Sequence, residues 1–180
     1  MDIKYTKNYT NNLFQDWTAN SGNYKSRTVL ILFRLASLIR GNIFLTILFL
    51  WYLILYRFFI EWILSIQINW HVKMGKGLRL SNGQGSIIES TTILGNHCTL
   101  RHHTTIGHKI LPDGTFSLSP RLGHNVDIGS NVTIIGNIII GDNVIIGAGA
   151  VITKNVPSNA VMVGNPGRIL KMVYEHGTLG

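Results

Sequence analysis

The sequence is poor in cysteine and in charged residues. Cys98 is the single cysteine, so the chain cannot form an internal disulfide, and no Cys/His spacing typical of a metal site occurs. Only 13% of the 180 residues are charged, roughly half the usual share, whereas 46% are hydrophobic. This balance excludes a disordered chain and predicts extensive burial within a single domain or one domain with a helical appendage.

Acidic residues are the scarcer charged class. Against 16 Lys and Arg stand 8 Asp and Glu, which gives a net charge of +8. The positive charges never form a block, so we expect no nucleic-acid partner; an anionic cofactor or an anionic membrane face fits better. The N-terminus lacks the apolar run and the small-residue cleavage site of a secretory signal, so we expect a cytoplasmic protein.

Glycine is nearly missing from residues 1–70, which contain only Gly22 and Gly41, whereas the other seventeen of the nineteen glycines lie from Gly75 onward. We therefore expect two parts, an N-terminal helical segment at 1–70 and a second domain at 71–180. The first part contains long apolar runs without proline, which are typical of helices. Gly41 and the asparagine after it are the expected break between two helices.

The second of these helices is strongly apolar. Its uncharged stretch, Gly41–Tyr56, is shorter than the roughly 20 apolar residues that a membrane span needs. Arg57 and Glu61 then follow at a spacing that allows them to pair on one helix face. Two interpretations stay open. Either the helix is buried against the fold or a partner subunit, or it lies on a membrane surface, which its aromatic residues and the arginines upstream favour.

The second part repeats with a period of six residues. Aliphatic side chains recur from Leu122 to Ile152, and glycine or another small residue usually follows them, which predicts a chain that turns at every repeat. Twelve repeats can be counted from Met74 onward, and three repeats per turn would give about four coils. Two longer intervals place loops at 81–85 and 107–121, and loops on a rigid solenoid often carry the chemistry.

These repeats resemble those of the hexapeptide-repeat acyltransferases. The segments that carry the resemblance include TLRHHTTIG, VDIGSNVTIIGNIIIGDNVIIGAGAVITKNVP and VGNPGRIL, within residues 65–173. The chain looks most similar to serine O-acetyltransferases and to relatives that acetylate surface polysaccharides. The resemblance implies a mainly β fold, namely a left-handed parallel β-helix with an N-terminal helical segment. It also implies a homotrimer that uses acetyl-CoA as co-substrate. We expect no metal, because no pair of ligands repeats with the spacing of a metal motif.

The resemblance further implies a base for the hydroxyl proton and a donor for the thioester oxygen. Serine acetyltransferases carry an Asp-His pair where this chain has Ser81-Asn82, and an Asp at the position of Gln67. They carry a second histidine, followed by proline, where this chain has Ser119-Pro120. Asn82 cannot accept a proton but can still position the acceptor.

The replacement base is expected at His102 or His103. His102 is favoured, because polysaccharide-modifying relatives often read Thr-Ile-Arg-His-Gly in this segment. The alternative is that both histidines are turn or trimer-packing residues. Cys98 occupies an inward position of its repeat and is expected in the core, so we predict direct transfer rather than an acyl-cysteine intermediate.

The resemblance places CoA in the groove between neighbouring subunits, where the backbone makes most contacts. Carried over position by position, it assigns the pantetheine arm to Gly107, Ser130 and Ala148. Lys154 and Arg168 are the cations available to the phosphates of CoA, with ordinary surface charges as the alternative.

We therefore predict an acetyl-CoA-dependent O-acetyltransferase that acetylates a sugar hydroxyl during exopolysaccharide, capsule or lipopolysaccharide assembly. The acceptor would be a sugar or a lipid-linked oligosaccharide, and the apolar helix suits peripheral contact with the inner membrane face. Serine O-acetylation in cysteine synthesis is the alternative enzyme, and another acceptor such as an amino sugar or an antibiotic is a third. A catalytically lapsed hexapeptide scaffold is the alternative of a different class, suggested by Asn82 and Gln67.

Overall fold

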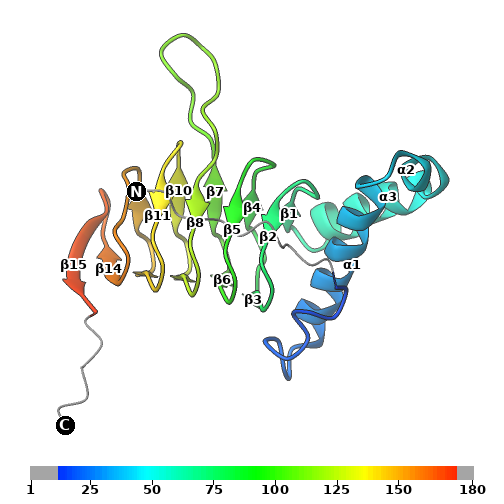
Figure 1. The fold of residues 1–180 in the computed structure, drawn as a ribbon, viewed down its shortest axis with the longest axis horizontal. Coiled ribbons are helices and arrows are strands. Elements are labelled where there is room, and N and C mark those ends of the chain that lie inside the picture. Colours follow the sequence, from blue (N-terminus) through cyan, green and yellow to red (C-terminus); the bar gives the residue numbers. More distant parts are fainter. Residues whose placement is uncertain (1–11, 174–180) are drawn as a thin grey trace.

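Short parallel strands wind into a solenoid, and helices cover one of its ends (Figure 1). The computed structural model describes residues 12–173. The strands of the first three coils are β1 (Gln67–Ile68), β2 (Lys73–Met74), β3 (Arg79–Ser81), β4 (Ile87–Ile88), β5 (Ile93–Leu94), β6 (Thr99–Arg101), β7 (Thr105–Gly107), β8 (Arg121–Leu122) and β9 (Asp127–Ile128). The remaining strands are β10 (Thr133–Ile135), β11 (Ile139–Ile140), β12 (Ile145–Ile146), β13 (Val151–Ile152), β14 (Ala160–Val163) and β15 (Arg168–Met172).

Each strand pairs in parallel with the equivalent strand one coil away, which builds three sheets along the solenoid. The first sheet has the order β1-β4-β7-β10-β13, and the second contains β2, β5, β8 and β11. The third stacks β3, β6, β9, β12 and β14, and β15 pairs antiparallel with β14 at its edge. The mainly β, parallel solenoid with an N-terminal helical segment confirms the predicted fold class.

The solenoid has about five coils, one more than the repeat count predicts. Ile68 is the core residue of β1, the first strand of the solenoid. No glycine follows it to mark a turn, so the six-residue pattern does not include this first repeat. At the other end Met162 lies ten residues after Ile152, and this long interval hides the last strand from a six-residue pattern. The solenoid therefore begins at Gln67 rather than at residue 71.

The core is a stack of aliphatic side chains, one from each strand. In the third sheet Leu80, Leu100, Ile128 and Ile146 lie on successive strands, and each is at most 2% exposed. The neighbouring strand residues face outward, as expected for a sheet with one buried face. Burial of each such side chain contributes about 2 kcal/mol, so this stack is the main source of stability.

The helices are α1 (Tyr24–Arg40), α2 (Ile43–Leu48), α3 (Leu50–Arg57) and the π-helix η1 (Phe58–Ile63). The predicted break is confirmed, because Gly41 ends α1 and the Asn42 side chain accepts the Phe44 N–H at 2.9 Å to cap α2. The apolar segment forms three successive pieces instead of one helix. The predicted pair forms between Arg57 Nε and Glu61 Oε1, which lie 3.2 Å apart.

Arg34 fastens α1 to the first coil. Its Nε donates to Asp16 Oδ2 at 2.9 Å, and its other nitrogens donate to the carbonyls of Met74 and Gly75 at 2.8 and 2.7 Å. Asp16 Oδ1 in turn accepts the Leu78 N–H at 2.9 Å. Because both charged side chains are buried and hydrogen-bonded, they hold the helical segment in one orientation on the solenoid.

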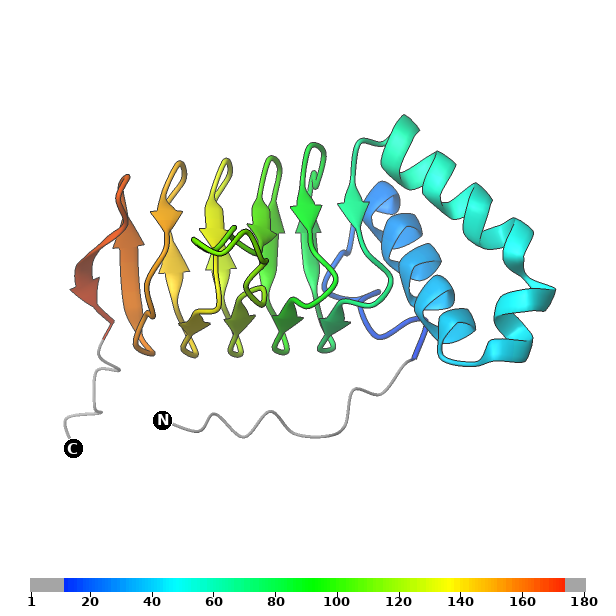
Figure 2. The ribbon, with the colours of Figure 1, turned by 90° about the horizontal axis from the view of Figure 1, so that it is seen from above.

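The two ends of the solenoid are covered differently. Figure 2 shows the helices at the end next to the first coil and the strand β15 at the opposite end. Among residues 12–173, no helix is both long enough and apolar enough to cross a bilayer.

Candidate functional site

The predicted base residues lie at the corner where the chain passes from the third sheet to the first. We call this corner, residues 82–85, 102–103, 130–131 and 148–149, the histidine corner. Backbone hydrogen bonds align its coils: the N–H of His103 donates to Gln84 O at 2.8 Å, and the N–H of Asn131 donates to His102 O at 3.0 Å. A third bond joins Gly149 N–H to Ser130 O at 2.9 Å. His102, Ser130 and Ala148 consequently occupy equivalent positions on successive coils.

His103 serves the turn. Its φ is 55°, in the left-handed region that favours glycine and asparagine, and the equivalent residues Gly85, Asn131 and Gly149 also have positive φ. The ring lies directly over Gly85, because a Cβ at Gly85 would collide with His103 Nδ1. His103 is therefore part of the turn, and its ring packs on Gly85 of the neighbouring coil.

Both histidines are exposed, and His102 is the one whose ring has a neighbouring hydroxyl. Its side chain is exposed, and its Nδ1 lies 3.2 Å from the Ser130 hydroxyl. In the tautomer where Nδ1 carries the proton and donates to Ser130 Oγ, Nε2 is left as an unprotonated acceptor. A hydroxyl that orients an imidazole in this way is the arrangement that a general base needs. The structure thus brings together a predicted base and a residue predicted to contact the cofactor.

Asn82 lies one coil away from His102. Asn82 follows Ser81, which pairs with Arg101, so it lies at the histidine corner. The backbone bond from His103 to Gln84 makes Gln84 the residue equivalent to His102, and the turn of the first coil is two residues longer. Asn82 has a φ of 50°, and its carbonyl accepts the Gln84 N–H at 2.6 Å. Within the described residues its amide has no hydrogen-bond partner, so the amide is free to bind a ligand group.

Arg101, which the sequence reasoning did not single out, supports the strand that leads to His102. Its Nη1 pairs with Asp127 Oδ1 and also donates to Ile128 O at 3.0 Å. These contacts cross from one coil to the next on the outside of the third sheet. They fix the backbone immediately before His102.

The five predicted cofactor residues do not meet within one chain. Ser130 and Ala148 are neighbours at the histidine corner, and Arg168 begins β15 near the last coil of that corner. Gly107 ends β7 in the first sheet, and Lys154 lies after β13 in the same sheet. The candidates therefore form two groups: Ser130, Ala148 and Arg168 near the beginnings of the strands of the first sheet, and Gly107 and Lys154 at their ends.

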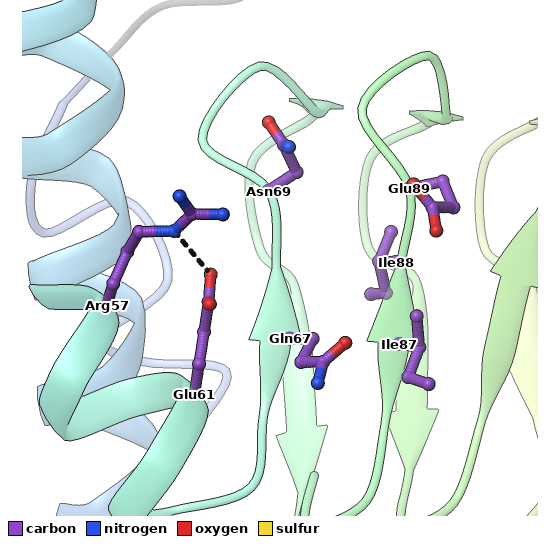
Figure 3. Close-up of a pocket in the computed structure, with 7 residues that line it drawn as sticks. All are labelled: Arg57, Glu61, Gln67, Asn69, Ile87, Ile88 and Glu89. Atoms are coloured by element: carbon purple, nitrogen blue, oxygen red, sulfur yellow. Dashed lines mark hydrogen bonds and ion pairs between the residues drawn. The ribbon is translucent and has the colours of Figure 1, made fainter.

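A polar pocket of about 210 Å³ lies on the first sheet beside the helices (Figure 3). It contains Gln67, the residue at the position of a family aspartate, together with Asn69 and Glu89 from the strand ends and the pair Arg57–Glu61 from the helical segment. Figure 3 shows the Gln67 amide on β1 and the Glu89 carboxylate just after the end of the neighbouring strand β4.

Glu89 is a candidate that the sequence reasoning missed. A Cβ at Gly107 would lie 2.9 Å from Glu89 Cγ, so the absence of a side chain at Gly107 makes room for this carboxylate. Within residues 12–173 neither Glu89 nor Gln67 has a side-chain hydrogen-bond partner, which leaves both groups for a ligand. The repeat pattern marks position 89 as an outward residue. Three repeats of six residues per coil place Gly107, eighteen residues further on, beside it, and this is the sequence signal that could have found Glu89.

Cys98 is a core residue, as predicted. It is fully buried, its Sγ lies 3.3 Å from Gly123 O, and burial raises the pKa of the thiol to about 11. A protonated, buried thiol cannot act as a nucleophile near neutral pH. Across the described residues, no group of three or more His, Cys, Asp or Glu is arranged to hold a metal ion.

The long loop between β7 and β8 is a hairpin that projects from the solenoid (Figure 1). An antiparallel bridge joins Ile110 to Phe116, and the His108 ring packs on Phe116 with centroids 4.4 Å apart. Ser119 is buried and accepts the Thr91 hydroxyl at 2.8 Å. Ser119, which the resemblance sets at the position of the family's second histidine, is thus held by Thr91.

A solenoid of six-residue repeats in three parallel sheets defines the class of hexapeptide-repeat proteins. The signature of the family described as "Bacterial transferase hexapeptide (six repeats)" matches residues 119–154. The chain is 30% identical over 118 residues to the putative colanic acid biosynthesis acetyltransferase WcaB of Escherichia coli K12. The match covers 65% of this chain and 70% of WcaB. The chain therefore belongs to the hexapeptide-repeat transferase family.

Serine acetyltransferases are further relatives. Serine acetyltransferase 2 of Arabidopsis thaliana is 33% identical over 113 residues, covering 63% of this chain. That match spans only 34% of the Arabidopsis protein, so the shared part is about a third of its length. The structure of soybean serine acetyltransferase without ligands is similar with a TM-score of 0.74 at 27% identity, and the match covers 88% of this chain and 67% of the soybean chain.

Proposed function

We propose that the protein is an O-acetyltransferase that transfers the acetyl group of acetyl-CoA to a sugar hydroxyl, with His102 as general base. The observation that carries the proposal is the contact between His102 Nδ1 and the Ser130 hydroxyl at 3.2 Å on an exposed corner. It supplies an oriented imidazole in a chain that lacks the Asp-His pair. The acetyltransferase names of the relatives support the same reaction class.

The proposed reaction is a direct transfer. His102 Nε2 accepts the proton of the acceptor hydroxyl while the hydroxyl oxygen attacks the thioester carbonyl. The tetrahedral intermediate then collapses, the C–S bond breaks, and the proton on His102 passes to the departing CoA sulfur. The burial of Cys98 supports a route without an acyl-enzyme.

The cofactor residues favour a site shared by two chains of a homotrimer. Gly107 and Lys154 lie where strands of the first sheet end, whereas Ser130, Ala148 and Arg168 lie near the beginnings of these strands. In a closed ring, the first group on each chain would face the second group on its neighbour, so both groups would line one groove. The backbone at Gly107 and Ala148 would flank the pantetheine arm, and Lys154 and Arg168 would meet the phosphates.

A sugar acceptor fits the polar groups better than serine does. The positions at which serine acetyltransferases carry acids and histidines hold Gln67, Ser81 and Asn82, and the buried Ser119 faces Thr91. Amides and the free carboxylate of Glu89 suit the many hydroxyls of a carbohydrate. The relative named for colanic acid biosynthesis supports this class, while the serine acetyltransferase relatives keep L-serine as the second candidate.

The test is acetyl-CoA turnover, followed as release of free thiol, with sugars, lipid-linked oligosaccharides and L-serine offered separately. We expect release with a carbohydrate acceptor and none with L-serine. Release with L-serine alone would replace the sugar by serine, and CoA binding without turnover on any acceptor would favour the scaffold alternative.

The base is tested by the variant His102→Ala. Ala148 occupies the equivalent position two coils on, so alanine fits this backbone. We expect turnover to fall about 10²- to 10⁴-fold, the usual contribution of a general base. The matched control is His97→Asn, an exposed histidine at a different corner whose positive φ asparagine tolerates. Equal turnover in His102→Ala and His97→Asn would remove His102 from the mechanism.

A further inference from the structure

The outward face of α2, α3 and η1 is an extended apolar surface, which we call the outer face. Twelve large hydrophobic side chains on it are each at least 44% exposed, and Phe44 and Trp62 reach 80%. Only a few residues of these helices, such as Leu53, Tyr56 and Ile60, are buried against the rest of the chain. A contiguous apolar surface of this kind marks a binding surface, because soluble proteins rarely leave one in water.

The positive charges nearest to the outer face gather where the helices meet the first coil. No charged residue occurs between Gly41 and Tyr56, while Arg40 and Arg57 stand at the two ends of this stretch. Both guanidinium groups lie over the ring of Trp70, at 5.8 and 5.1 Å from its centroid. Arg40 also lines a hollow with Lys73 at the base of the helices. Arg40, Arg57 and Lys73 therefore form a positive margin on the solenoid side of the apolar helices. Cations and aromatic rings beside an apolar face are typical of helices that lie in a bilayer interface.

The outer face also opens into an apolar hollow of about 510 Å³ between α1 and the following helices. Leu35 and Leu38 line it from α1, and Leu45, Phe49 and Trp51 line it from the other side. Flexible hydrocarbon chains can fill an irregular hollow of this kind. A bilayer supplies such chains, together with the anionic headgroups that the positive margin requires.

The outer face lies at the end of the molecule, where a flat surface such as a bilayer can reach it. Figure 2 shows α3 beyond α1, on the side away from the coils, at the end of the solenoid. The sheets and the histidine corner are therefore left uncovered when this end is occupied. From these observations we infer that α2, α3 and η1 bind the surface of an anionic lipid bilayer and lie in its interface. The inference concerns binding alone and does not depend on the acetyl acceptor.

The test is co-sedimentation of the full chain with vesicles of phosphatidylcholine and with vesicles that also contain phosphatidylglycerol. We expect binding to the anionic vesicles, weakened by salt, and a blue shift of tryptophan fluorescence on binding. The double variant Phe44→Gln/Trp62→Gln changes only highly exposed side chains, so its folding should be intact, and it should lower the partition coefficient by more than about tenfold.

The matched control is the double variant Ile110→Gln/Phe116→Gln, which removes two exposed apolar side chains from the hairpin and should bind like the parent chain. Absence of binding to either vesicle would overturn the inference. So would binding that the Phe44/Trp62 variant leaves unchanged. Self-association that this variant abolishes, in a chain that ignores vesicles, would instead assign the outer face to a second copy.

Discussion

The hydroxyl of Ser130 lies next to the ring of His102, and this contact distinguishes His102 from the adjacent His103. We predict that Ser130→Ala lowers kcat about tenfold while the KM for acetyl-CoA changes less, because the imidazole loses its orientation but the backbone at position 130 stays in place. Steady-state kinetics over a range of pH would show this loss together with a changed pH profile. Ser130→Thr keeps the hydroxyl and should restore most of the rate.

If Ser130→Ala lowered affinity for acetyl-CoA and left kcat and the pH profile unchanged, Ser130 would belong to the cofactor site alone. The sequence assigns Ser130 to the pantetheine arm by resemblance, whereas its contact with His102 depends on the register between coils.

The thiol of Cys98 offers a second measurement at the residue scale. Because burial raises its pKa to about 11, the native thiol stays protonated at pH values where the unfolded thiol ionises. A raised pKa means that the stability contribution is full below the unfolded pKa of about 9 and is lost as the pH rises toward 11. We expect the melting temperature to fall over this range, and to fall less in Cys98→Ala.

Alkylation gives an independent reading of the same thiol. The native chain should react with iodoacetamide far more slowly than the chain in denaturant. Equal rates, or a pH dependence that Cys98→Ala leaves unchanged, would contradict the buried position.

Single residues could be predicted where the repeat fixes their direction. Cys98 occupies an inward position, and its burial follows from the period alone. The turn role of His103 could also have been found, since Gly85, Asn131 and Gly149 fill the equivalent positions. Glu89 could have been found in the same way, because three six-residue repeats per coil place Gly107, eighteen residues further on, beside it in the next coil.

At the scale of elements, the corners between the second and third sheets depend on close backbone approach. A Cβ at Gly95 would press against the carbonyl of Gly123 in the next coil, where no side chain can yield. We predict that Gly95→Ala destabilises the fold by about 2–4 kcal/mol, measured by urea unfolding. The control Gly147→Ala meets first a methyl group of Val163 at 3.1 Å, which can move, and should cost clearly less.

Equal stability of the Gly95→Ala and Gly147→Ala variants would show that the coils can separate slightly without loss of stability.

The elements themselves were largely predictable: six-residue periodicity fixes strand and turn, and Gly41 with Asn42 marks the helix break. The division of the apolar segment into α2, α3 and η1 was not predictable, since neither proline nor glycine interrupts residues 43–63. The docking of α1 through Arg34 and Asp16 was also missed, because the two residues carry no local signal.

At the scale of the whole molecule, the proposed shared groove requires more than one chain. We predict a mass of three times 20.1 kDa by light scattering after size-exclusion chromatography, with detergent present to shield the outer face. A monomer that turns over acetyl-CoA at the full rate would contradict the shared groove.

The architecture as a whole could be predicted from the repeats, whereas the exposure of the outer face could not. The sequence of an apolar helix is similar whether the helix faces a core, a subunit or lipid.

The coverings at the two ends of the solenoid decide how large an assembly can grow. A stack of parallel strands could in principle be lengthened by another chain, one coil upon the next, into a fibre. The helices cover the first coil, and β15, turned antiparallel on β14, occupies the edge of the third sheet at the other end. Lengthening through the third sheet is therefore opposed at both ends, and the sides of the solenoid are left for the closed ring proposed above.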